Sequence, residues 1–177
     1  GKACMDGVMS ALLAERVFTS SKNIIEGELG ILDVLTEYPD KGSVLDKLGS
    51  KYYLSDISFK PYPTCAWTHS AIGLLEGIHA NHRPNIEDVE EIYIETGPVA
   101  FTSAGIKNPK IGTEGKFSLW FLAALALAEG NVTLERFTDT KVNDPDLIRL
   151  REKVNANLVR ELKFGARVTV RMKDGTE

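Results

Sequence analysis

The sequence has few of the features that mark secreted, zinc-binding or membrane-spanning proteins. Cys4 and Cys65 are the only cysteines among 177 residues. Two cysteines cannot build a disulfide framework or a four-cysteine zinc site, so a reducing, intracellular environment is expected. The longest apolar run, residues 119–128, has about half the length that a membrane-spanning helix requires.

An excess of positive charge is also missing. The chain has 21 Lys and Arg against 25 Asp and Glu, which gives a net charge of −4. This balance offers no basic surface for nucleic acid and no polybasic patch for a membrane, so we expect neither as a partner. The first four residues lead directly into a helical pattern instead of a signal peptide. We therefore expect a soluble protein of the cytoplasm, or of mitochondria if the source is eukaryotic.

The chain does contain enough apolar material for one domain, together with signs that it belongs to a larger protein. Hydrophobic residues make up 43% of it, which suits a single well-filled core. No capping residue precedes the first helical stripe, at Val8 and Leu12. Only two residues follow the hairpin signal Asp174-Gly175. We expect a fragment truncated at both ends; the alternative is a natural short protein.

Hydrophobic periodicity predicts the secondary structure. The expected helices cover residues 3–16, 29–37, 43–48, 65–81, 114–129 and 146–154, and the expected strands cover 52–60, 89–96, 155–162 and 166–173. Thr64 and Thr113 are the predicted N-caps of two helices, Gly130 is a predicted stop, and Pro145 opens the last helix.

This order of elements predicts the fold class α+β. We expect a two-layer sandwich in which a small mixed sheet carries helices on one face. A helical segment of a larger helical domain would precede it. The predicted domains are residues 1–49, the end of the helical domain with linker helices, and residues 50–177, an α+β domain truncated at its C-terminus.

The densest group of candidate functional residues runs from Lys60 to His69. A predicted strand ends and a predicted helix begins there, and the first turn of a helix offers free N–H groups to an anion. An enzyme that removes a proton beside a carboxylate needs cations on the carboxylate and a nearby acid or base. Lys60 and His69 could supply these. Alternatively, Lys60 is a solvated charge and His69 packs in the core.

Other patterns are less complete. Cys65 and His69 stand four residues apart, so a thiolate–imidazolium pair is conceivable, although a lone cysteine is more often an inert apolar residue. His79 and His82 lack a further ligand at metal-binding spacing, so we expect no metal. The glycine-containing segment that ends at Lys116 departs from a phosphate loop at two positions, but its lysine could still meet an anion.

Several segments resemble one known family. Lys60-Pro-Tyr-Pro-Thr-Cys65, followed by Trp67-Thr-His-Ser-Ala-Ile72, is similar to a lysine, proline and histidine segment of the 2-methylcitrate dehydratase (MmgE/PrpD) family. Glu114-Gly-Lys-Phe-Ser-Leu119 also resembles that family. The opening helix and the closing segment from Ala166 to Gly175 fit it as well, in the family's order.

The resemblance implies a cofactor-independent lyase or isomerase acting on small di- or tricarboxylates. Dehydratase, decarboxylase and epimerase members transfer a proton next to a carboxylate without a metal or an iron–sulfur cluster. It implies that Lys60 and His69 are catalytic, and it places the substrate-binding residues at the 64–65 turn and where the second lid helix begins. The implied substrate-binding residues are Thr64, Cys65, Lys116 and Phe117.

The resemblance further implies that this chain is mainly the smaller lid domain of a full-length homodimeric enzyme. Because the helical domain supplies further acid–base residues, we expect the fragment to be inactive alone. Two departures favour an epimerase-like or uncharacterised branch. Gly73 stands where many relatives have an acidic residue, and Phe117 replaces a tyrosine.

Two alternatives from other classes stay open. The chain could be a stand-alone module that binds a carboxylate metabolite or forms a dimer with a regulatory role. It could also be a cysteine hydrolase that uses Cys65. Acidic, histidine and lysine residues in an upstream helical region would favour the enzyme over the module, and alkylation well below neutral pH would favour the hydrolase.

Overall fold

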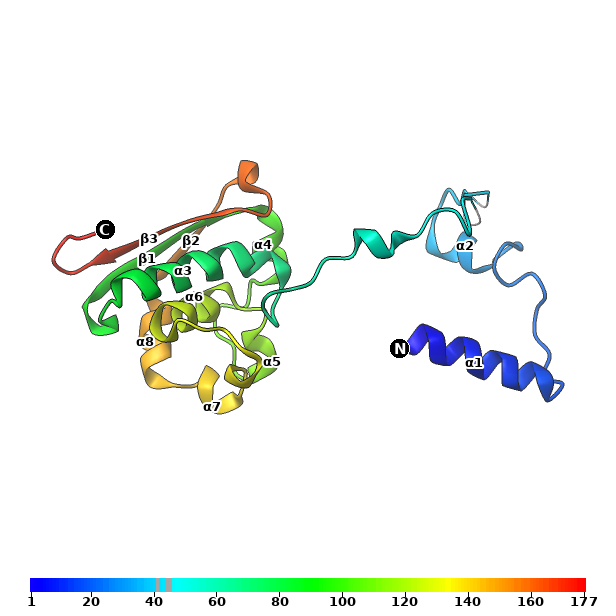
Figure 1. The fold of residues 1–177 in the computed structure, drawn as a ribbon, viewed down its shortest axis with the longest axis horizontal. Helices are drawn as coiled ribbons and strands as arrows, with labels where there is room; N and C mark the ends of the chain where they lie inside the picture. Colours follow the sequence, from blue (N-terminus) through cyan, green and yellow to red (C-terminus); the bar gives the residue numbers. More distant parts are fainter. Residues whose placement is uncertain (41, 44–45) are drawn as a thin grey trace. The chain divides into compact units, whose positions relative to one another are not determined.

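The computed structural model describes residues 1–40, 42–43 and 46–177, and these form two compact units. One unit covers residues 1–57 and the other covers residues 58–177 (Figure 1). All the candidate site residues lie in the second unit. The domain boundary between residues 49 and 50 stays a prediction.

The described part of residues 1–57 holds the helices α1 (Lys2–Glu15) and α2 (Ile31–Leu35) and a 3-10 turn, η1 (Tyr53–Asp56). These helices confirm the predictions over 3–16 and 29–37. The helix predicted over 43–48 includes positions 44 and 45, which lie outside the described residues. No residue of α1 is buried. None of the helices in the described residues combines the length and apolar character needed to cross a membrane.

The strand predicted over residues 52–60 is wrong. Tyr53 to Asp56 form the turn η1, and the apolar side chains around it are exposed, including Ile57 at 63% and Phe59 at 97%. Aromatic and β-branched residues favour a strand only where a neighbouring strand satisfies the backbone and covers one face. No described strand lies beside this segment, so the strand preference of its residues is not enough to form a strand.

The second unit is built on a mixed sheet of three strands, β1 (Val89–Thr96), β2 (Val154–Leu158) and β3 (Ala166–Met172), in the order β2-β1-β3. β1 is parallel to β2 and antiparallel to β3. The strand predicted over residues 155–162 is shorter than expected. It ends at Leu158, and a 3-10 turn, η5 (Arg160–Leu162), follows it. This turn begins the connection to the opposite side of β1.

One face of the sheet is buried and the other is polar. Ile92 and Ile94 alternate along β1 with more exposed residues and are fully buried, as is Val89 beyond an irregularity in the strand register. The opposite face carries cross-strand polar pairs such as Arg167 with Glu95, at 2.9 Å. Helices α3 (His69–His82) and α6 (Leu119–Glu129) contact β3 and β2 and each other, on the buried side (Figure 1). This arrangement confirms the two-layer α+β sandwich, with three strands instead of four.

The remaining elements connect these layers. They are η2 (Ala66–Thr68), η3 (Ile86–Asp88), α4 (Pro98–Ser103), α5 (Gly112–Gly115), η4 (Leu134–Arg136), α7 (Asp139–Val142) and α8 (Pro145–Glu152). α8 packs on α6 and begins with the predicted Pro145. The Asp144 side chain caps it by accepting a hydrogen bond from the Asp146 N–H at 3.0 Å.

The predicted cap Thr113 is wrong. It lies inside the short helix α5, and α6 starts later, where the Ser118 hydroxyl accepts a hydrogen bond from the Phe121 N–H at 3.1 Å. The predicted stop is confirmed, because Gly130 ends α6 with a positive φ of 65°.

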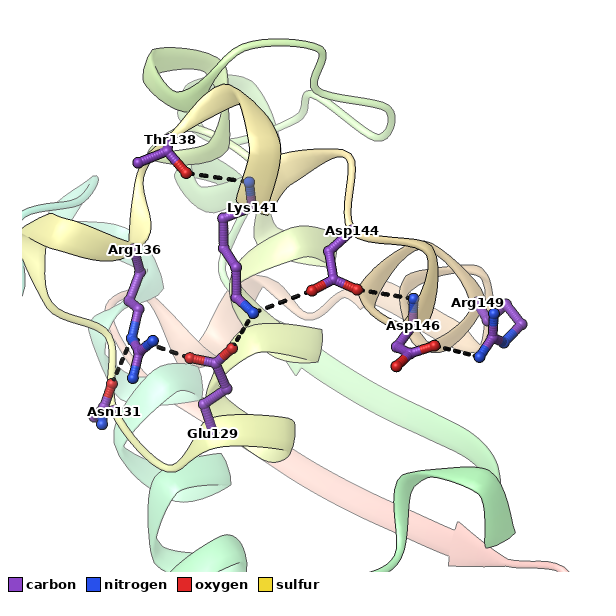
Figure 2. Close-up of polar contacts among 8 residues, drawn as sticks. All are labelled: Glu129, Asn131, Arg136, Thr138, Lys141, Asp144, Asp146 and Arg149. Atoms are coloured by element: carbon purple, nitrogen blue, oxygen red, sulfur yellow. Dashed lines mark hydrogen bonds and ion pairs between the residues drawn. The ribbon is translucent and has the colours of Figure 1, made fainter.

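A network of partly buried charges ties the end of α6 to α7 and α8 (Figure 2). Glu129, at the end of α6, forms ion pairs with Arg136 and with Lys141 of α7. Lys141 also pairs with Asp144 at 3.1 Å. Burial favours the neutral form of Asp144, but hydrogen bonds from Lys141 and from the Asp146 N–H outweigh it and lower the pKa of the Asp144 carboxyl.

This network gives the first testable prediction. Asp144→Asn keeps an oxygen for the Asp146 N–H and removes the charge that faces Lys141, so the free energy of unfolding should fall by about 1 kcal/mol at neutral pH. A carboxyl whose pKa is lowered on folding stabilises the fold above its ordinary pKa of 3.8 and loses that contribution as the pH falls. The deficit should therefore shrink in acid.

Urea unfolding followed by tryptophan fluorescence measures this, since both tryptophans of the chain, Trp67 and Trp120, belong to the second unit. Asp146→Asn is the matched control, because its side chain is 58% exposed and should contribute less. If Asp144→Asn lowered the free energy of unfolding by the same amount at neutral pH and in acid, the ion-pair explanation would be contradicted.

Candidate functional site

The second unit contains a cavity of about 400 Å³ that collects five of the six predicted site residues. The predicted residues that line it are Lys60, Thr64, Cys65, Lys116 and Phe117. They come from two segments far apart in sequence: the 60–65 segment before η2, and the 116–117 segment between α5 and α6. Pro63, Ala66, Trp67 and Ser103 complete the lining.

Backbone hydrogen bonds hold these two segments together. The Cys65 N–H donates to the Lys116 carbonyl at 3.2 Å. Lys60 folds back over its own segment and donates from Nζ to the Thr64 carbonyl at 3.3 Å. The Thr68 hydroxyl donates to the Cys65 carbonyl at 2.7 Å and lies 3.3 Å from the Thr64 hydroxyl. The 64–65 turn is thus fixed from both sides, which keeps the cavity wall in place.

Thr64 is not the helix N-cap that the sequence predicts. α3 begins at His69 and follows the turn η2, and the Thr64 hydroxyl contacts the Thr68 hydroxyl instead of a backbone N–H. The Cys65 N–H is already used by Lys116. An anion in this cavity would therefore depend on the two lysines, not on a helix terminus at residue 65.

The conceivable Cys65–His69 nucleophile is not formed. Cys65 has an extended backbone and precedes η2, so the two residues do not stand one helical turn apart. The cysteine is 8% exposed. Among the hydrogen bonds of the described residues, none joins its thiol to His69. Cys65 lines the cavity as a small apolar side chain.

His69 is the predicted site residue that does not line the cavity. Its ring meets the Tyr62 ring edge to face, with centroids 5.3 Å apart. Its Nε2 is buried without a hydrogen-bond partner among the described residues. Burial lowers the pKa of His69, a backbone hydrogen bond with Thr64 partly opposes this, and the charge of Lys60 lowers it further. Lys60 and His69 therefore interact electrostatically, and the ring is neutral near neutral pH.

Tyr62 and Glu76 belong to this group and were not predicted. The Tyr62 hydroxyl donates to the Glu76 carboxylate at 2.8 Å. Burial, this hydrogen bond and the negative charge of Glu76 raise the pKa of Tyr62 to about 12. Glu76 lies two turns after His69 on the same face of α3, and this spacing was the signal available in the sequence.

Lys116 and Phe117 lie between α5 and α6, so they are not inside a continuous helix as the prediction over residues 114–129 had them. The Lys116 ammonium is 5.5 Å from the centroid of the Phe137 ring, and Phe117 is 43% exposed. Trp67, a further lining residue that was not predicted, stacks on Phe164 with ring centroids 3.7 Å apart. Two lysines and no carboxylate line the cavity, a composition that suits a ligand with more than one negative charge.

A comparison with protein families gives one finding for this unit. A model of the MmgE/PrpD C-terminal domain matches residues 62–177. The chain belongs to the MmgE/PrpD family. The match includes five of the six predicted site residues and begins just after Lys60. A search of curated proteins gives no match. In the described residues, no group of three or more His, Cys, Asp or Glu side chains could hold a metal ion.

The coupling between Lys60 and His69 gives the second prediction. Lys60→Met removes a nearby positive charge, so the pKa of His69 should rise from its lowered value but stay below that of an exposed histidine, since burial persists. A two-dimensional imidazole NMR titration can resolve the three histidines of the chain.

Lys107→Met is the matched control, because Lys107 lies over Trp120, not beside His69. It should leave the His69 titration unchanged. A His69 pKa that stays the same in the Lys60 variant would show that the two groups do not interact.

Proposed function

We propose that this chain provides the lid of a cofactor-independent lyase or isomerase that transfers a proton next to a carboxylate of a small di- or tricarboxylate. The observation that carries the proposal is the cavity, which Lys60 and Lys116 line together although they come from segments far apart in the sequence. Membership of the MmgE/PrpD family supports a dehydratase-related reaction. The complete enzyme would act as a homodimer.

Each residue has a proposed role. Lys60 and Lys116 bind substrate carboxylates, and Lys60 also stabilises the negative charge that develops when a proton leaves the adjacent carbon. Thr64, Cys65 and Phe117 shape the cavity wall. His69 accepts the proton, because its lowered pKa keeps the ring neutral and its Nε2 has no competing partner among the described residues. Since His69 does not line the cavity, the proposal requires the bound substrate or the His69 ring to move before the proton is transferred.

A second candidate function is carboxylate binding without turnover, as in a stand-alone regulatory module. The cavity favours this candidate because the second unit forms it alone. The two candidates share the binding step and differ in the need for His69. A binding experiment and a turnover experiment therefore separate them.

The third prediction concerns binding. Propane-1,2,3-tricarboxylate should bind the chain, and Lys60→Met and Lys116→Met should each weaken it by about tenfold, since each removes a charge-assisted hydrogen bond. Calorimetry at low ionic strength measures this, with Lys107→Met as control. Binding that both cavity variants leave unchanged would refute the cavity as the carboxylate site.

The fourth prediction concerns turnover. In the full-length enzyme, His69→Ala should lower kcat by about a hundredfold or more on whichever tricarboxylate is turned over, which is typical for loss of a general acid–base group. His82→Ala, at an exposed position near the end of α3, is the control and should retain activity. A His69→Ala variant within a few-fold of wild type would refute His69 as the acid–base group, whereas a full-length protein that binds tricarboxylates and turns none over would favour the binding module.

A further inference from the structure

The segment that leads to Lys116 is held by the residues that begin α7. The Gly112 N–H, at the start of α5, donates to the Asp139 carboxylate at 2.8 Å. A Cβ added to Gly112 would come within 2.5 Å of the Phe137 carbonyl carbon, so only glycine allows the two backbones to lie this close. The position of α5, and with it the start of the Lys116 side chain, is therefore set by the 137–139 segment.

The side chain of Lys116 is the part of the residue that keeps rotational freedom, and Phe137 restrains it. The backbone is fixed, because the Lys116 N–H donates to the Thr113 carbonyl at 3.3 Å and the Lys116 carbonyl accepts the Cys65 N–H at 3.2 Å. The ammonium lies over the Phe137 ring, 5.5 Å from its centroid. That ring is anchored in the core, where it meets the Phe121 ring edge to face with centroids 6.3 Å apart.

Both lysines of the cavity are held by uncharged groups. The Lys60 ammonium donates to a backbone carbonyl, and the Lys116 ammonium lies over a ring. Among the ion pairs of the described residues, none includes either lysine. Lys141, by contrast, pairs with Glu129 and Asp144. A carboxylate cancels most of the charge of an ammonium, whereas the face of a ring attracts it and leaves its net charge in place.

We infer that Phe137 is a positioning residue for carboxylate binding, because its ring holds the Lys116 ammonium at the cavity and leaves the positive charge available to an anion. The inference rests on the proposed function, since it takes the cavity that Lys60 and Lys116 line as the carboxylate site. Phe137 does not line the cavity and acts only through Lys116. An incoming carboxylate then meets a cation that is already in place and has no ion pair to break.

A measurement without ligand tests the ring contact. Protons over the face of an aromatic ring are shielded, so the ε-methylene protons of Lys116 should resonate at lower chemical shift in the 177-residue chain than in its Phe137→Leu variant. The Lys116 resonances are identified by their absence from the Lys116→Met spectrum. Lys107, which lies over Trp120, is the matched control and should keep its chemical shift. Lys116 resonances that do not move would overturn the inference.

A double-mutant cycle tests the role in binding, with calorimetry of propane-1,2,3-tricarboxylate as the measurement. Phe137→Leu should weaken binding roughly three- to fivefold, because it removes a cation–π contact. In the Lys116→Met background the same substitution should change the affinity by less than about twofold, since no ammonium is left to hold. Equal losses in both backgrounds would show that Phe137 acts through general packing and would overturn the inference.

A wild-type chain that binds no tricarboxylate would refute the proposed function and, with it, the role of Phe137 in binding. Unmoved Lys116 resonances would refute the ring contact alone, so the two failures are distinguishable.

Two further variants keep the test decisive if Phe137→Leu does not fold. Phe137→pentafluorophenylalanine preserves the shape of the ring but withdraws negative charge from its faces, so it should weaken binding about as much as Phe137→Leu. Phe137→Tyr keeps the electron-rich face and should bind within about twofold of wild type. Undiminished binding by the fluorinated protein, or a severalfold loss in Phe137→Tyr, would contradict the inference.

Discussion

The second unit depends on one constraint, which is that α6 has no face suited to water. Every residue from Leu119 to Leu127 is at most 8% exposed. A helix that is apolar all round must be covered on all sides, and here β2, α3 and α8 contact it. Burial of each large apolar side chain contributes roughly 1.5–3 kcal/mol relative to leaving it exposed, so the surrounding elements arrange themselves around this helix.

The position of the candidate site follows from the same constraint. Gly115 lies so close to the start of α6 that an added Cβ would come within 3.0 Å of the Phe121 and Val142 side chains. This close contact holds the segment before α6 against the core. Lys116 is next in the chain, and its carbonyl receives the Cys65 N–H. The cavity is therefore attached to the buried core of the unit, although Lys60 is exposed and Lys116 is partly exposed.

The sequence predicted the elements whose signals are local. The alternation along β1, the proline at the start of α8 and the glycine after α6 all lie within a few residues, and the structure confirms them. The strand over 52–60 could not be excluded in this way, because its formation depends on a neighbour that the sequence does not identify. The placing of Thr64, Cys65 and Lys116 at one cavity was predictable only through the family resemblance. The contact of the His69 ring with Tyr62, away from the cavity lining, is a tertiary arrangement that no local pattern reveals.

The two units differ in how many of their apolar side chains are buried. Residues 58–177 bury one continuous core, whereas α1 buries no residue and leaves Met5, Val8 and Leu12 each more than half exposed. A helix of 14 residues is marginally stable in water without packing, so α1 needs an apolar surface that it does not find among its own described neighbours. A helical domain, which the family resemblance implies for the full-length enzyme, would provide such a surface.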